Sequence, residues 1–189
     1  MGPPGQQCTL EGIGTNVGSI KAAAQLLRQR FGRVGVLDID YHHGNGTQAI
    51  FWQRPDVFFA SLHADPHDDY PYLSGHASEV GAGAGTGFNL NLPLPRGTDF
   101  ARWSAALETA LAAIARFGAD ALVLSLGLDT FAGDPISGFS LQSDDYLRVG
   151  ARLQAAGLPT VGIFEGGYAV AEVGVNAVNV LEGFCQTGR

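Results

Sequence analysis

The chain has 189 residues, of which 46% are hydrophobic and 15% charged, the composition of a globular domain with a sizeable core. Its formal net charge is -7 and its basic residues form no cluster, which argues against nucleic-acid binding. No signal peptide opens the sequence, and no apolar run approaches the ~20 residues of a membrane span. We therefore expect a cytoplasmic protein that does not bind membranes.

Apolar runs of strand length alternate along the chain with segments of helical periodicity. The expected strands lie at residues 34–39, 57–62, 88–94, 121–128 and 160–164. The expected helices lie at residues 20–31, 100–117, 143–156 and 170–184, the second of them with Thr98 as its N-cap and Gly118 as its stop. Nearly continuous apolar runs are typical of parallel strands covered on both faces. The pattern predicts an α/β fold with three layers, in which an open, mostly parallel sheet carries helices on both faces.

Polar side chains gather where the expected strands end. Asp38, Asp40 and His42 lie at or just beyond the end of one run, Asp129 ends another, and Tyr168 follows a third. In open α/β sheets the ligand site lies at the carboxyl ends of the strands, where loops converge. A carboxylate buried there is costly unless it is paired or bound to a cation.

The spacing of these residues predicts a metal site. Asp40 and His42 are two residues apart in an extended chain, so their side chains point to the same side. With Asp129 they make three protein ligands, the arrangement of a catalytic zinc site that keeps one position open. His43 faces the other way and is expected to pack or to orient a ligand. Taken singly, the same residue types are also common in turns and helix caps.

Four segments together resemble a known family. DIDYHHGNGT (38–47), SLHAD (61–65), LSLGLDTFAGDP (124–135) and EGGY (165–168) are similar to the deacetylase part of the arginase–deacetylase superfamily. GHASEVG (75–81), GDPISGF (133–139) and EGGYAV (165–170) resemble the acetylpolyamine amidohydrolases among its histone-deacetylase-like enzymes. The resemblance covers roughly residues 33–184. It implies a single deacetylase-type domain over residues 1–189, truncated at its N-terminal side because the family's first strands are missing.

The resemblance also implies an activity. Family members are zinc-dependent hydrolases that remove acetyl groups from acetylated amines, here acetylpolyamines or acetyl-lysine, by means of metal-activated water; iron is the alternative metal. Asp40, His42 and Asp129 match the family's metal ligands, and Tyr168 matches the tyrosine that hydrogen-bonds the substrate carbonyl. The sequence leaves open whether the protein forms a homo-oligomer.

Further site residues follow from the same resemblance. A structural potassium ion is expected at Asp38, Ser61 and Leu62, together with the backbone carbonyls of Asp40 and His42. Tyr72 or Leu73 is expected to line the tunnel that receives the acyl group. The acidic residues of the adjoining loop, Asp65, Asp68 and Asp69, are expected to be solvated charges, with attraction of a cationic amine as the weaker alternative.

The N-terminal segment departs from the family pattern. Family members carry a tandem histidine pair after Pro-Gly, whereas here Pro3-Pro4-Gly5 is followed by Gln6-Gln7. Glutamine does not exchange a proton near neutral pH, so general acid–base catalysis worth about 10²–10⁴ in rate would be lost. The activity is therefore expected to be reduced or lost, and the alternative is a non-catalytic, metal-containing module that binds acylated amines. A third hypothesis, a two-metal ureohydrolase, would need a second set of Asp and His metal ligands.

Overall fold

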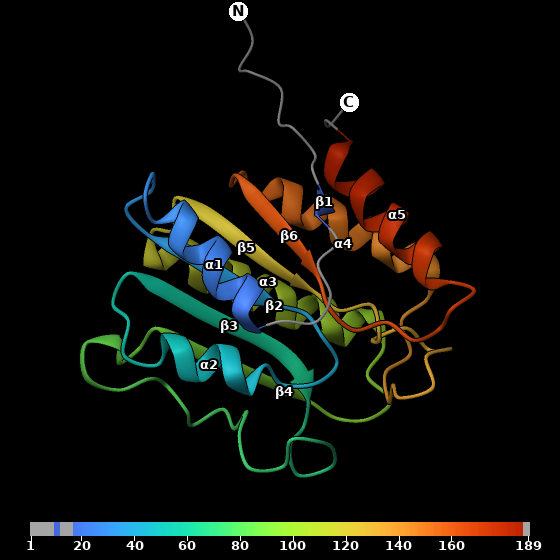
Figure 1. Ribbon diagram of the computed structural model, residues 1–189. Helices are drawn as coiled ribbons and strands as arrows, with labels where there is room; N and C mark the ends of the chain where they lie inside the picture. The colour runs from blue at the N-terminus through green and yellow to red at the C-terminus, as the bar shows by residue number, and fades with distance from the viewer. Residues whose placement is uncertain (1–9, 12–16, 187–189) are drawn as a thin grey trace, which may run out of the picture.

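The computed structural model describes residues 10–11 and 17–186. Its strands form one sheet in the order β1-β6-β5-β2-β3-β4, and every neighbouring pair is parallel (Figure 1). The strands are β1 (Leu10–Glu11), β2 (Val34–Asp38), β3 (Val57–Ala64), β4 (Asn89–Leu94), β5 (Ala121–Leu126) and β6 (Thr160–Phe164). The predicted parallel sheet is confirmed.

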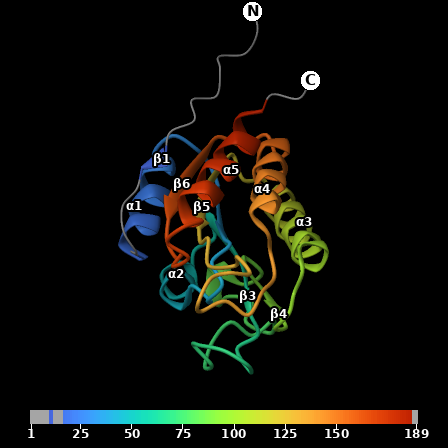
Figure 2. The ribbon, with the colours of Figure 1, turned by 90° about the vertical axis from the view of Figure 1, so that its right-hand side faces the viewer.

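Helices cover both faces of this sheet. They are α1 (Val17–Leu27), α2 (Asn45–Phe51), α3 (Phe100–Phe117), α4 (Ser143–Ala155) and α5 (Val173–Cys185), with a 3₁₀ turn at Gly83–Gly85. Figure 2 shows the sheet between α1 and α2 on one side and α3 and α4 on the other. Ile20 of α1 joins the core cluster of the first face, whereas Trp103 of α3 and Tyr146 of α4 join that of the second. The three-layer prediction is therefore confirmed.

Some element boundaries differ from those predicted. Helix α2 begins at Asn45, between two glycines that favour a turn when they are considered locally. Strand β1 has two residues and exists through its pairing with β6, so no periodic pattern marks it. Helix α3 is capped by Asp99, whose side chain accepts a hydrogen bond from the Arg102 N–H at 2.9 Å, and not by Thr98. Gly118 ends this helix in the left-handed conformation, as expected.

The central strands of the sheet are more deeply buried than the strand next to β1. Every residue of β2, β3 and β5 is buried, whereas four of the five residues of β6 are only partly covered. Beyond β6, Val170, Val175 and Val178 are exposed. Among the described residues, no helix combines the length and apolarity needed to cross a membrane.

Candidate metal centre

The metal-site residues predicted from the sequence meet at the carboxyl edge of the sheet. Asp40 and His42 lie directly beyond β2, and Asp129 lies directly beyond β5, the neighbour of β2. The parallel register places Asp38 opposite Ser125, so both strands end at the same level. The loops that follow β2 and β5, although far apart in the sequence, therefore begin side by side.

The three side chains form a compact set of ligand atoms. One atom from each of Asp40, His42 and Asp129 lies within 4.8 Å of the other two. The His42 Nδ1 is 3.8 Å from an oxygen of Asp40 and 3.7 Å from Oδ2 of Asp129. Backbone N–H groups hold both carboxylates: His42 donates to Oδ1 of Asp40, Gly166 donates to its Oδ2, and Tyr41 donates to Oδ1 of Asp129. The orientation of the two carboxylates is therefore set by backbone donors.

The charges at this edge fit a cation. Burial, reinforced by the charges of Asp129 and Asp38, raises the pKa of Asp40 well above its ordinary value. Burial also raises the pKa of Asp38 to about 8, with the carboxylates of Glu165 and Asp129 adding to the effect. Carboxylates grouped in this way repel one another unless a positive charge lies among them. Two carboxylates and one imidazole form a donor set that suits a divalent cation such as zinc.

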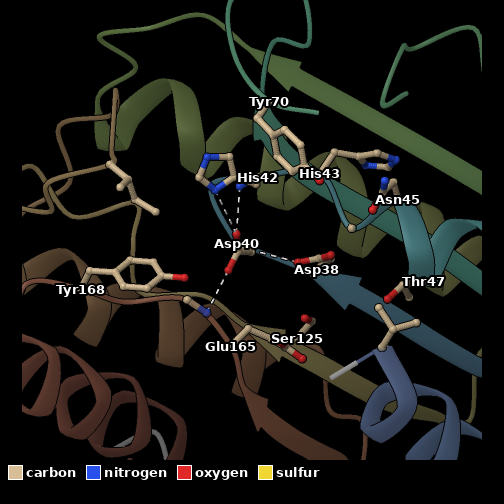
Figure 3. Close-up of a pocket in the computed structure, with 14 residues that line it drawn as sticks. Asp38, Asp40, His42, His43, Asn45, Thr47, Tyr70, Ser125, Glu165 and Tyr168 are labelled. Carbon is tan, nitrogen blue, oxygen red and sulfur yellow. Dashed lines mark hydrogen bonds and ion pairs between the residues drawn. The ribbon is translucent and has the colours of Figure 1, made fainter. Parts of the chain in front are cut away.

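A pocket of about 400 Å³ opens beside Asp40 and His42 (Figure 3). Its lining includes Asp38, Asp40, His42, His43, Asn45, Thr47, Tyr70, Ser125, Ile136, Glu165 and Tyr168. The Tyr168 hydroxyl points toward Asp40 in Figure 3, and the Tyr168 side chain is half exposed. Burial and the nearby carboxylates, Asp40 first among them, raise the pKa of Tyr168, so its phenol is protonated at neutral pH. The pocket thus combines a cation site with a neutral hydrogen-bond donor.

Gly166 makes the close approach of the two loops feasible. Its N–H donates to Oδ2 of Asp40 at 3.0 Å, and its carbonyl accepts from Leu128 at 2.7 Å. A Cβ at this position would lie 2.5 Å from Oδ2 of both Asp40 and Asp129. A side chain there would displace these two carboxylate oxygens, which gives a steric reason for the glycine of the EGGY segment.

The loop after β3 places different residues at the pocket than the sequence suggested. Tyr72 and Leu73, expected to line a tunnel, are exposed and do not line the pocket, whereas Tyr70 does. The Tyr70 ring centroid lies 6.1 Å from that of His42. Asp69 is not a solvated charge, because it accepts hydrogen bonds from the Tyr41 hydroxyl and from Arg96, both at 2.8 Å. No local signal separates Tyr70 from Tyr72, since both are tyrosines in the same loop.

His43 faces away from the three ligands, as the alternation along the segment predicted. Its ring is buried, its centroid lies 4.5 Å from that of the tilted His63 ring, and it makes no hydrogen bond among the described residues. Burial, with a contribution from His63, lowers the pKa of His43 to about 3. Ser61 and Leu62 are also buried, and Ser61 lies opposite Asp38 in the β2–β3 register.

Two expectations concern ligands and residues elsewhere in the chain. Within the described residues, one group of three or more potential ligands is close enough to hold a metal, so nothing supports the two-metal reading. Gln6 and Gln7, at the expected position of the histidine pair, lie outside the described residues. The sequence alone indicates no role for Asp134, which lies in the GDPISGF segment. Its position, five residues after the ligand Asp129, is the local feature that could have marked it as a site residue.

Comparison with known proteins gives consistent matches. Residues 16–184 match the model of the histone deacetylase domain. The chain is 53% identical over 186 residues to acetylpolyamine amidohydrolase 2 of Pseudomonas aeruginosa, covering 96% of this chain and 54% of that protein. It is 48% identical over 185 residues to acetylpolyamine amidohydrolase of Mycoplana ramosa, with 96% and 54% covered. The chain spans about half the length of these curated relatives.

Solved structures agree with the sequence matches. The acetylpolyamine aminohydrolase of Burkholderia pseudomallei superposes with a TM-score of 0.86 at 44% identity, over 88% of this chain and 49% of that one. An HDAC homologue complexed with SAHA superposes with a TM-score of 0.80 at 31% identity, over 87% of this chain and 45% of that one. The fold and the sequence therefore point to the same set of proteins.

Proposed function

The chain belongs to the histone deacetylase family, and we propose that it serves metal-dependent hydrolysis of acetyl groups on amines such as acetylpolyamines or acetyl-lysine. One observation carries the proposal: Asp40 and His42, clustered with the buried Asp129, line a pocket that the Tyr168 hydroxyl also enters. The acetylpolyamine amidohydrolases among its relatives support an acetylated amine as the substrate class.

Asp40, His42 and Asp129 are the proposed ligands of a divalent cation, with zinc favoured and iron as the alternative. A cation bound there would polarise the amide carbonyl and acidify water. The two carboxylates would balance the charge of the cation, and Gly166 leaves room for their two Oδ2 atoms to lie close together.

Tyr168 is the proposed stabiliser of the charge that develops on the carbonyl oxygen. Its hydroxyl faces the ligand cluster, and its raised pKa keeps the proton on the phenol. A neutral donor that is already in position gains strength as the oxygen becomes more negative in the transition state. Tyr70 and Ile136 supply apolar surface to the same pocket, next to the place that the acetyl group would occupy.

We also propose a structural monovalent-cation site. The adjacency of Asp38 and Ser61 in neighbouring buried strands supports a structural potassium ion, with Leu62 and the carbonyls of Asp40 and His42 as further ligands. A cytoplasmic location and a single deacetylase-type domain over residues 1–189 stay predictions. The same holds for the absence of nucleic-acid and membrane partners and for a homo-oligomer.

A second candidate function rests on Gln6-Gln7. If these residues stand where the family has its histidine pair, the protein keeps a metal pocket but lacks the groups that move protons. Such a protein would bind acylated amines without hydrolysing them. Its binding and its turnover would then be separable in experiment.

The test uses the full chain, metal-free for the zinc titration and loaded with zinc for the turnover assays. Isothermal titration measures the metal stoichiometry, and acetate release from N-acetylputrescine and from an acetyl-lysine peptide measures turnover. We expect one zinc per chain, bound through the ligand triad, and acetate release that is lost in Asp40→Ala. Asp68→Ala, an exposed acidic residue in a neighbouring loop, is the matched control and should behave as wild type.

The outcomes separate the two candidates. Acetate release supports the hydrolase. Zinc binding with amine binding but no acetate release supports the binding module, and turnover gained on Gln6→His with Gln7→His would then identify the missing groups. Failure to bind zinc at all would contradict both.

A further inference from the structure

Asp134 joins the loop after β5 to the loop that carries Tyr168. Its side chain is buried, with 5% of the residue exposed. Oδ2 accepts hydrogen bonds from the backbone N–H groups of Tyr168, at 2.6 Å, and Ala169, at 3.0 Å. Oδ1 accepts from the N–H of Ile136 at 3.1 Å. Both carboxylate oxygens are therefore occupied by backbone donors.

Three backbone hydrogen bonds offset the cost of burying this carboxylate. A buried charge is expensive unless it is hydrogen-bonded, and bonds to a charged acceptor are shorter and stronger than neutral ones. The 2.6 Å bond, which is the shortest of the three, involves the N–H of Tyr168 itself. The strongest link of this carboxylate is thus to the residue whose side chain enters the pocket.

The side chain of Tyr168 has little packing of its own to fix it. It is 50% exposed, whereas Tyr146 is 1% exposed and its hydroxyl bonds to Thr130 and to the Leu128 carbonyl. The residue before Tyr168 is Gly167, whose φ of 146° is open to glycine and rare for other residues. The direction of the Tyr168 hydroxyl therefore depends on where its backbone is held.

The same loop also carries a metal ligand. Asp129 and Asp134 are five residues apart, and the turn between them is closed by the Asp134 N–H, which donates to the Phe131 carbonyl at 3.0 Å. One loop thus provides a ligand atom and, five residues later, the acceptor for the Tyr168 backbone.

We propose that Asp134 is a positioning residue for Tyr168: its carboxylate holds the Tyr168 backbone so that the hydroxyl faces the ligand cluster. The role of Tyr168 in turnover rests on the proposed function, whereas the anchoring of its backbone does not. Ile136, the third partner, lines the same pocket, so the carboxylate also fixes a wall of the site.

Amide hydrogen exchange, followed by NMR on the full chain, tests the anchor without any turnover. Asp134→Asn keeps the shape but weakens the acceptor, and we expect the amides of Tyr168 and Ala169 to exchange at least about tenfold faster while those of β5 stay protected. Asp145→Asn is the matched control, because Asp145 also accepts a backbone N–H, that of Gln142, but at the start of α4. Unchanged exchange at Tyr168 in both Asp134→Asn and Asp134→Ala would overturn the proposal.

A double-mutant cycle tests the coupling to chemistry. If Asp134 acts through Tyr168, Asp134→Asn should lower kcat by about tenfold in the wild-type background and by less than about twofold in Tyr168→Phe, with zinc affinity preserved in both. An equal loss in both backgrounds would mean that Asp134 acts independently of Tyr168 and would contradict the proposal. If the zinc-loaded wild type has no turnover, the proposed hydrolysis fails, and the exchange experiment still decides the anchor.

Discussion

The backbone N–H of Tyr41 donates a hydrogen bond to Oδ1 of Asp129 over 2.9 Å. The two oxygens of this carboxylate therefore have different partners. Oδ1 accepts the backbone hydrogen bond, whereas Oδ2 lies 3.7 Å from Nδ1 of His42. Tyr41 lies between the other two ligands, so the bond joins the segment after β2 to the loop after β5. A backbone hydrogen bond therefore holds the Asp129 carboxylate next to the segment that carries the other two ligands.

The division of roles in Asp129 gives a sharp prediction. In Asp129→Asn the amide oxygen can still accept from Tyr41, while the nitrogen replaces the oxygen that faces His42. We expect zinc affinity to fall at least about a hundredfold, since a charged ligand is lost, with little change in the metal-free melting temperature. Titration calorimetry and thermal unfolding provide the two measurements. Wild-type affinity in this variant would exclude Asp129 as a ligand, and Asp68→Asn is the control.

Gly166 should strengthen metal binding although it supplies no side chain. An alanine there would push against Oδ2 of both Asp40 and Asp129, so we expect Gly166→Ala to lower zinc affinity by about tenfold or more. Gly174→Ala is the matched control because a Cβ at Gly174 meets no atom within 4 Å. Equal zinc titrations for the two variants would show that the loop gives way at little cost.

The N-cap of α3 can be tested by stability alone. Asp99→Ala removes the acceptor of the Arg102 N–H and should lower the free energy of unfolding by about 1 kcal/mol. Thr109→Ala, an exposed change within the same helix, should cost nothing, since alanine favours helices. Urea unfolding measures both. A loss as large in Thr109→Ala would show that the cost in Asp99→Ala is not specific to the cap.

Asp56 should make the stability depend on pH at the acidic end. Hydrogen bonds from Arg54, together with the one from Arg28, hold the pKa of Asp56 well below its ordinary value of 3.8. The folded state binds the proton more weakly than the unfolded chain, so this stabilisation is fully present above about pH 4 and is lost as the pH falls further. We expect Asp56→Asn to cost about 1 kcal/mol near pH 6 and less near pH 3.

Urea unfolding at the two pH values measures this difference, with Asp68→Asn as the control at an exposed carboxylate. A cost of Asp56→Asn that is the same at both pH values would show that the ion pairs with Arg54 and Arg28 do not carry the effect.

Short-range patterns predicted much of the fold. The apolar runs gave the strands β2 to β6 because buried parallel strands need continuous apolar sequence, and the helical periods gave α1, α3, α4 and α5. Helix α2 and strand β1 were missed, because α2 lies in a glycine-rich segment and β1 exists only through a neighbouring strand. Neither element can be predicted from local residue propensities alone.

The sequence by itself determined which polar residues follow the buried strands, since apolar runs mark those strands and Asp40, His42 and Asp129 come after them. Residues 40–42 form a bend beyond β2, in which Asp40 and His42 face one way and His43 the other. Only the tertiary structure decided which partners reach them. The β2–β5 register brings Asp129 within reach, the bonds of Asp69 set the loop from which Tyr70 enters the pocket, and Asp134 holds the backbone of Tyr168. These contacts join residues from different loops, and their distances depend on packing and register that no local pattern encodes.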